Sequence, residues 1–225
     1  MEIELLKKVP IFSNLSDEEL AKIRKLCVTQ HYEKDRLILI EEESGKTLFL
    51  LQKGRVKISR MSDDGREVIL SILGPGGFFG ELSLIDGKSR SASVTAIENS
   101  EVLLLHRAEF LALLEDYPQI AISLLKELAA RIRKSDTQIK SLSLQDAMGR
   151  VASTLILLAE DTGRIRQGTV IIPKIPLQQD LANMSGTSRE TISRVFRYFE
   201  EENLIKREGR RVTIPEYEKF KRMFA

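Results

Sequence analysis

The chain has 225 residues, of which 42% are hydrophobic and 30% are charged, so it is long enough for two domains with packed cores. No stretch approaches the ~18 consecutive apolar residues of a membrane helix, which excludes a membrane-spanning helix. Met1–Glu4 lack the basic start and the apolar run of a signal peptide, and we therefore expect a cytoplasmic protein with no membrane partner. The single cysteine, Cys27, excludes an internal disulfide and an all-cysteine metal or iron–sulfur site.

The net charge of +2 is unevenly distributed along the chain. Residues 1–145 carry 21 basic and 22 acidic side chains, whereas residues 146–225 carry 14 and 11. The first part therefore has a charge of −1 and the second a charge of +3. This difference favours the C-terminal part as the one that would contact nucleic acid.

Residues 1–117 are predicted to form a β-rich domain that opens with a helix. Ser16 and Glu19 have the spacing of a capping box, and Cys27 falls on the apolar face of the helix that follows. Asp63–Arg66 is typical of a hairpin turn. Short apolar runs separated by turn residues indicate an antiparallel sandwich or jelly roll; they lie at 36–40, 47–51, 55–59, 68–73 and 102–105.

Residues 118–143 are predicted to form one long helix that begins at Pro118. Its side chains repeat every seven residues in two rows, the pattern of a helix that pairs with a second copy. One row is Leu125, Ile132 and Ile139, and the other is Ala121, Leu128, Ser135 and Leu142. Ser135 stands where leucine is expected, and Asp136 follows it. The alternative is an amphipathic helix packed only on its own sheet.

Residues 145–225 are predicted to form a winged helix-turn-helix. Two helices, over 177–184 and 188–200, flank a short turn, and the small residues Ala182 and Gly186 allow them to cross closely. A basic hairpin is expected over 204–214. The alternative is an ordinary helical hairpin.

The second of these helices carries side chains that can contact DNA. Arg189 can donate two hydrogen bonds to guanine and Glu190 can accept one from cytosine, at the helix end where base edges are met. Thr187 and Ser188 can cap the helix and touch phosphate, as can the wing residue Arg210. The same face also carries Ser193, Arg194 and Arg197. The alternative is a charged, solvated face.

A glycine-rich run over 74–80, followed by Glu81 and Arg90, suits a small anionic ligand. An arginine together with backbone N–H groups after a tight glycine turn can hold a phosphate, and a carboxylate can accept from a sugar hydroxyl. Together these groups fit a cyclic nucleotide. The alternative is an ion pair between Glu81 and Arg90 that braces a loop.

Two runs carry a resemblance to a known family. Residues 79–82 and 90–92 resemble the phosphate-binding cassette of cyclic-nucleotide-binding domains, and 187–194 is similar to the recognition helix of the CRP/FNR family of bacterial transcription regulators. The resemblance covers nearly the whole chain. It implies an α+β homodimer with a β-roll (jelly-roll) sensor domain at 1–117, a dimerisation helix and hinge at 118–144, and a winged helix-turn-helix domain at 145–225. We place the hinge near Leu144–Asp146.

The resemblance also implies the site residues. The effector site would comprise Gly80, Glu81, Leu82, Arg90, Ser91, Ser135 and Asp136. Gly80 and Glu81 would meet the ribose, and Arg90 and Ser91 the phosphate. Ser135 and Asp136 would meet the base. DNA contacts would come from Thr187, Ser188, Arg189, Glu190, Arg194 and Arg210. The implied partners are double-stranded DNA with a palindromic site of TGTGA-like half-sites, a second copy of the chain, and RNA polymerase.

Two departures from the family pattern concern the effector. The loop between Glu81 and Arg90 is one residue shorter than in the best-known cAMP-responsive member. Asp136 replaces a hydroxyl residue, and a carboxylate can accept from the adenine amino group or from two guanine donors. The expected effector is cAMP, with cGMP as an alternative. A regulator that binds DNA without any effector, its cassette kept only as structure, is a further alternative.

Other chemistries have little support in the sequence. The histidines, His31 and His106, are far apart and do not suggest a metal site or a haem ligand, and Cys27 alone cannot hold an iron–sulfur cluster. A cupin-type jelly-roll enzyme would need a cluster of metal-binding histidines, and we expect no enzymatic activity.

Overall fold

The computed structural model describes residues 2–224, and its contacts divide the chain into two compact units, residues 1–132 and 133–225. Met1 and Ala225, the ends of the expected domains, lie outside the described residues. Within that described part, no helix is long and apolar enough to cross a membrane.

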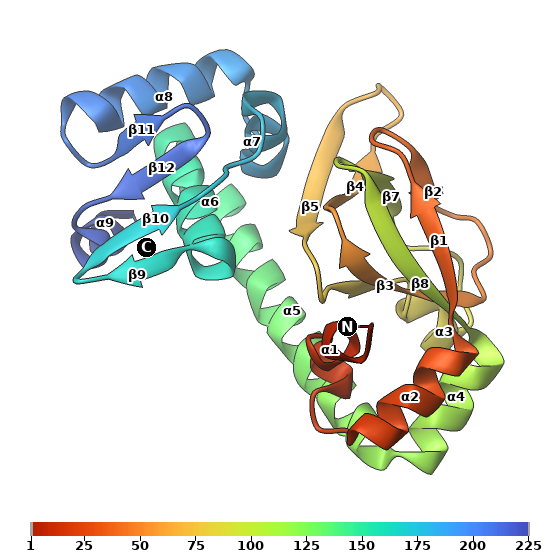
Figure 1. Cartoon of the computed structure of the whole chain (residues 1–225). Coiled ribbons are helices and arrows are strands. Elements are labelled where there is room, and N and C mark those ends of the chain that lie inside the picture. The colour runs from red at the N-terminus through yellow and green to blue at the C-terminus, as the bar shows by residue number, and fades with distance from the viewer. Residues whose placement is uncertain (1, 225) are drawn as a thin grey trace. The chain divides into compact units, whose positions relative to one another are not determined.

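The first unit is a β-roll with helices at one end of its strands (Figure 1). Its helices are α1 (Glu2–Lys7), η1 (Pro10–Phe12), α2 (Asp17–Leu26), α3 (Leu82–Asp86), α4 (Arg107–Asp116) and the first half of α5 (Pro118–Leu144). Its strands are β1 (Val28–Tyr32), β2 (Leu37–Leu39), β3 (Thr47–Lys53), β4 (Val56–Met61), β5 (Glu67–Leu73), β6 (Phe78–Phe79), β7 (Ser93–Ala96) and β8 (Ser100–His106). They form sheets of order β1-β8-β3-β6 and β2-β7-β4-β5 with antiparallel pairing, which confirms the predicted jelly roll.

The capping box and the hairpin turn predicted from local sequence patterns both form. The Ser16 hydroxyl accepts from the Glu19 amide and the Glu19 carboxylate accepts from the Ser16 amide, so the capping box begins α2. Between β4 and β5 the Ser62 amide donates to the Arg66 carbonyl at 2.9 Å, and Gly65 has a φ of +80°. The hairpin turn predicted at 63–66 is therefore confirmed.

Strand β3 is buried on both faces and separates the two cores of this unit. Leu48 and Leu50 point to a core shared with the helices, whereas Phe49 and Leu51 point into the roll beside β6. Burial on both sides fixes the register of β3, and with it the position of the chain that leaves β6 at Gly80.

Helix α5 has two apolar faces. Ile120 and Leu124 are buried in the core of the first unit. The row of Leu125, Ile132 and Ile139 remains 66%, 62% and 61% exposed. The helix thus packs on its own domain and in addition presents an apolar row to solvent, so the alternative of packing on its own sheet accounts for only one face.

The second unit is a winged helix-turn-helix. It contains the end of α5, then α6 (Ala147–Thr162), β9 (Arg164–Arg166), β10 (Thr169–Ile172), α7 (Gln178–Ser185), α8 (Arg189–Glu201), β11 (Lys206–Glu208), β12 (Arg211–Ile214) and α9 (Tyr217–Phe224). The sheet has the order β11-β12-β10-β9. Gly186 ends α7 with a φ of +59°, and α8 begins three residues later. The predicted motif and its wing are confirmed, whereas α9 has no counterpart in the prediction.

Candidate functional site

The turn between β6 and α3 is built around Gly80. Its φ of +84° is one that L side chains rarely adopt, and a Cβ on this residue would lie 2.7 Å from Nη1 of Arg90. Glycine therefore provides both the backbone conformation and the space for the arginine. Glu81 follows as the N-cap of α3.

Arg90 is a buried cation, with only 6% of its surface exposed. Its Nη1 donates to the carbonyl of Gly80 and to the hydroxyl of Ser83, both at 2.7 Å, and its Nη2 donates to the carbonyl of Thr47 at 2.9 Å. Burial lowers the pKa of Arg90, and the nearby charge of Glu81 partly opposes this shift. A buried guanidinium whose described acceptors are neutral oxygens favours an anion beside it.

Glu81 is buried as well, with 3% exposed, but its partner is not Arg90. Its Oε1 accepts from Nη1 of Arg131 at 2.8 Å. Nη2 of Arg131 donates to the carbonyl of Phe78 at 2.9 Å, and the guanidinium lies over the Phe78 ring at 4.4 Å. The alternative of an ion pair between Glu81 and Arg90 is therefore wrong.

Arg131 is the residue that the sequence reasoning missed. It lies on α5, 50 positions from Glu81 in the chain, so no local pattern links the two. One signal was available: Arg131 precedes Ser135 by one helical turn and therefore shares its face of the helix.

The other expected effector-site residues lie at the surface. Leu82 is 42% exposed on α3, and Ser91 is exposed just after Arg90. Ser135 and Asp136 are exposed on α5 and belong to the second unit. Their share in an effector site stays a prediction.

Helix α8 has one apolar and one polar face. Ile192, Val195, Phe196 and Phe199 are buried in the core of the second unit. The opposite face exposes Arg189, Glu190, Ser193, Arg194 and Arg197. The hydroxyl of Ser188 accepts from the amide of Thr191 at 3.1 Å, which caps the helix as expected. Thr187 precedes this cap and is half-buried.

The wing has a basic tip between β11 and β12. Arg210 is exposed, and its Nε donates to the carbonyl of Ile175 at 2.8 Å. This bond holds the arginine at the turn and leaves its terminal nitrogens available to a ligand. An exposed cationic wing and an exposed recognition-type helix on one unit form a surface suited to DNA.

Comparison with known proteins identifies both halves of the chain. Residues 29–117 match the family model of the cyclic nucleotide-binding domain, and residues 149–223 match that of the Crp-like helix-turn-helix domain. The cyclic AMP receptor protein of Thermus thermophilus is 36% identical over 201 residues, which cover 89% of this chain and 90% of that protein. The chain belongs to the CRP family of DNA-binding transcription regulators.

A further relative and a solved structure match most of the length of this CRP-family regulator. The CRP-like cAMP-activated global transcriptional regulator of Mycobacterium tuberculosis is 32% identical over 97% of the chain and 98% of that protein. The structure of a CooA mutant from Carboxydothermus hydrogenoformans has a TM-score of 0.79 at 23% identity, over 91% of this chain and 90% of that one. Because its relatives are transcription regulators, the protein is not an enzyme, and the cupin-type alternative is wrong.

The cysteine of this CRP-family regulator is a core residue, and its two histidines lie on strands β1 and β8. Cys27 is 7% exposed, and its thiol donates to the carbonyl of Ile23 at 3.3 Å. Burial raises the pKa of the Cys27 thiol to about 11, so the group is neutral and packs as core. His31 lies 3.6 Å from the Glu101 carboxylate, and His106 ends β8. In residues 2–224 no cluster of three or more His, Cys, Asp or Glu side chains could hold a metal ion.

Proposed function

We propose that this protein is a cytoplasmic homodimer whose sequence-specific DNA binding is controlled by a cyclic nucleotide. The observation that carries the proposal is the buried Arg90, which donates only to neutral oxygens among the described residues and lies beside a buried carboxylate. An anion with a neighbouring hydroxyl matches this pair of groups, and a 3′,5′-cyclic nucleotide has both.

Within the proposed site each residue has one task. The charge of Arg90 neutralises the phosphate, and Ser91 donates to it. Gly80, Glu81 and Leu82 border the ribose, with the Glu81 carboxylate accepting from the 2′-hydroxyl. Arg131 already occupies one carboxylate oxygen at 2.8 Å, which holds the other in a defined direction.

The base of the nucleotide is assigned to Ser135 and Asp136. The Asp136 carboxylate can accept from the adenine amino group or from guanine N1–H and N2–H₂. We therefore propose cAMP as the effector and retain cGMP as its competitor. The names of several relatives, which include cAMP, support the first choice.

The DNA-bound form is proposed to be a dimer on a palindrome. The exposed row of Leu125, Ile132 and Ile139 on α5 would pair with the same row of a second copy. Two recognition helices would then enter successive major grooves ~34 Å apart and read half-sites that resemble TGTGA. RNA polymerase is the proposed downstream partner.

A second candidate is an effector-independent regulator of the same family. The observation that favours it is that Nη1 and Nη2 of Arg90 already donate three hydrogen bonds to protein oxygens at 2.7 to 2.9 Å, so the chain itself holds the arginine in place. In this form Arg90 would be a structural residue and DNA binding would be constitutive.

Titration calorimetry distinguishes the two candidates. The protein is titrated with cAMP, cGMP and, as a control, 5′-AMP, which lacks the ring that presents a singly charged phosphodiester. Binding of a cyclic nucleotide, together with a gain in DNA affinity by fluorescence anisotropy, supports the proposed function. DNA binding with no response to either nucleotide at millimolar concentration supports the effector-independent regulator.

A further inference from the structure

The end of α5 is tied along the side of α6. Lys134 pairs with Asp161 at 2.5 Å, near the far end of α6. The hydroxyls of Ser141 on α5 and Ser153 on α6 both donate to the side chain of Gln145, which lies between the two helices. The ion pair and the hydrogen bonds are spaced along residues 133–144. Residues 133–144 and α6 therefore form an antiparallel helical hairpin.

Gln145 uses both ends of its side-chain amide for contacts at this turn. Its Oε1 accepts from Ser141 at 2.6 Å and from Ser153 at 2.8 Å. Its Nε2 donates to the backbone carbonyl of Phe224 at 2.7 Å. A backbone carbonyl can only accept, so the nitrogen must face Phe224 and the oxygen must face the serines. One side chain thus joins α5, α6 and the C-terminal helix α9.

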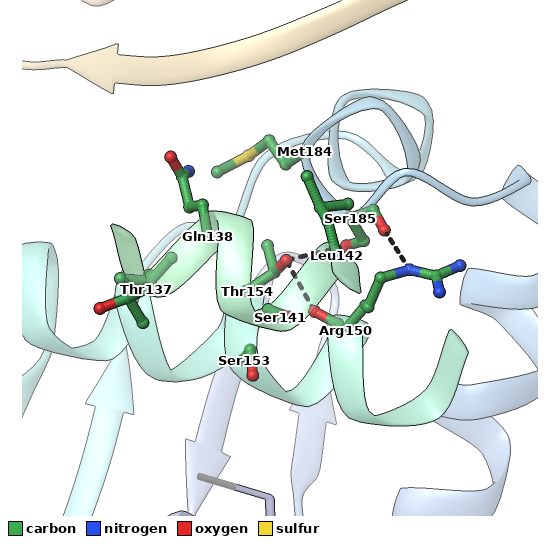
Figure 2. A pocket seen from close by; sticks show the side chains of 10 residues that line it. Thr137, Gln138, Ser141, Leu142, Arg150, Ser153, Thr154, Met184 and Ser185 are labelled. Carbon is green, nitrogen blue, oxygen red and sulfur yellow. Dashed lines mark hydrogen bonds between the residues drawn. The ribbon is translucent and has the colours of Figure 1, made fainter. Parts of the chain in front are cut away.

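Arg150 continues the connection to the helix-turn-helix. Its Nη1 donates to the carbonyl of Gln145 at 3.1 Å, and its Nε donates to the carbonyl of Ser185, the last residue of α7, at 3.0 Å. Figure 2 shows Arg150 reaching this carbonyl beside Thr154, whose hydroxyl lies 2.9 Å from that of Ser185. The turn after Ser185 leads directly to α8. Leu142 of α5 borders the same small pocket.

Phe224, whose carbonyl Gln145 meets, packs its ring against the core of the second unit. The Phe224 ring lies 5.3 Å from that of Phe199 on α8 and 5.1 Å from that of Phe220. The C-terminal helix is therefore anchored to the inner side of the recognition helix, and its last described residue reaches back to the expected hinge.

We propose that Gln145 is a latch that makes residues 133–224 move as one body. A change in α5 then reaches the recognition helix through two routes, Gln145 to α9 and Arg150 to the end of α7. The bonds of Gln145 span the segment near Leu144–Asp146 where the sequence places the hinge. The C-terminal helix α9 becomes part of the allosteric connection. This inference rests on the proposed function for its effector.

The test compares substitutions of the latch with a neighbouring control. Gln145→Ala removes all three side-chain bonds. Gln145→Glu keeps an acceptor for both serines but has no N–H for the Phe224 carbonyl, so it isolates the α9 connection. Ser143→Ala is the control, because Ser143 is exposed on the same turn of α5 as Ser141. DNA affinity is measured by fluorescence anisotropy with and without saturating cAMP.

The quantity compared is the factor by which cAMP raises DNA affinity. We expect Gln145→Ala to reduce this factor at least fivefold, Gln145→Glu to reduce it by a smaller amount, and Ser143→Ala to leave it within twofold of wild type. An unchanged factor in Gln145→Ala overturns the latch. Wild-type protein that binds DNA equally well with and without cAMP overturns the cAMP-controlled function instead.

Hydrogen exchange tests the latch without any effector. In Gln145→Ala we expect faster amide exchange in three segments, 137–144, 147–154 and 217–224, and no change in β3 of the first unit. Exchange at wild-type rates in all three segments means that Gln145 does not hold them together, whatever the effector does.

Discussion

The Arg131 guanidinium donates to the Glu81 carboxylate at 2.8 Å, so a side chain of α5 holds the carboxylate that is proposed to meet the ribose. The helix that presents the exposed apolar row is thereby connected to the cassette inside one unit. A ligand that repositions Glu81 would act on α5 through this bond. The pair is therefore proposed to join effector binding to the dimerisation helix.

The Glu81–Arg131 pair should show energetic coupling. Arg131→Met leaves a buried carboxylate without its partner, and Glu81→Gln removes the charge that Arg131 meets. Because 35% of the Arg131 side chain is exposed, we expect a coupling energy of about 0.5–1.5 kcal/mol, in the lower part of the range for contacting pairs. Urea unfolding of both single variants and of the double variant measures it. Additive costs would mean that the pair contributes no stability.

Arg90→Ala should abolish cyclic nucleotide binding in calorimetry, because the phosphate loses the only formal positive charge assigned to it. Arg90→Lys keeps the charge but loses the fork that reaches Gly80 and Thr47 together, and we expect intermediate affinity. The free energy of unfolding should fall less than the binding energy does. If both variants bind like wild type, Arg90 does not contact the phosphate.

Arg189→Ala and Arg210→Ala should weaken DNA binding in different ways. The first should cost ~1–3 kcal/mol on the cognate site and relax the preference at one guanine. The second should lower affinity for all sequences and flatten its salt dependence, since it removes a phosphate contact. Anisotropy titrations with cognate and altered duplexes at several salt concentrations measure both effects. Equal weakening on every duplex by Arg189→Ala would contradict base reading.

Ser135→Leu should raise DNA affinity in the absence of nucleotide. Leucine completes the row in which Ser135 stands, so the helix pairing no longer needs a ligand to extend it. The same change should weaken nucleotide binding, because it removes a hydroxyl assigned to the base. Anisotropy with and without cAMP is the measurement. Effector dependence equal to that of wild type would show that helix pairing at this position is not the switch.

Asp136→Ser should shift the nucleotide preference toward cAMP. A hydroxyl cannot accept the two guanine hydrogen bonds that a carboxylate can, so affinity for cGMP should fall relative to that for cAMP. Competition calorimetry gives the ratio of the two affinities. DNA affinity in the nucleotide-bound form serves as the control and should stay unchanged, since Asp136 is assigned no DNA contact. A constant ratio would remove Asp136 from the base site.

Stability should depend on Cys27 at alkaline pH. Burial raises the pKa of the Cys27 thiol from 9.0 to about 11, so unfolded chains lose this proton before folded ones do. The folded state is therefore destabilised between pH 9 and 11, by up to about 2–3 kcal/mol. The measurement is the difference in unfolding free energy between wild type and Cys27→Ala, at pH 8 and at pH 11. A difference that does not change with pH would place the thiol in contact with water.

The sequence by itself determined the elements whose causes are local. Ser16 and Glu19 cap α2 with their own hydrogen bonds, and Gly186 ends α7 where a positive φ is needed. The heptad spacing of α5 and the alternation of β4 also depend only on the period of helix and strand. Local sequence also determined the N-cap of α8 at Ser188 and the polar face of that helix.

Only the tertiary structure decided which distant residues meet. Arg131 pairs with Glu81 across 50 positions, and Gln145 donates to Phe224 across 79, and no local pattern encodes either contact. Both contacts depend on how α5 packs, on the cassette in one unit and on α6 and α9 in the other. The partner of a buried charge or amide is whichever group the packed chain brings within about 3 Å, and packing is a property of the whole fold.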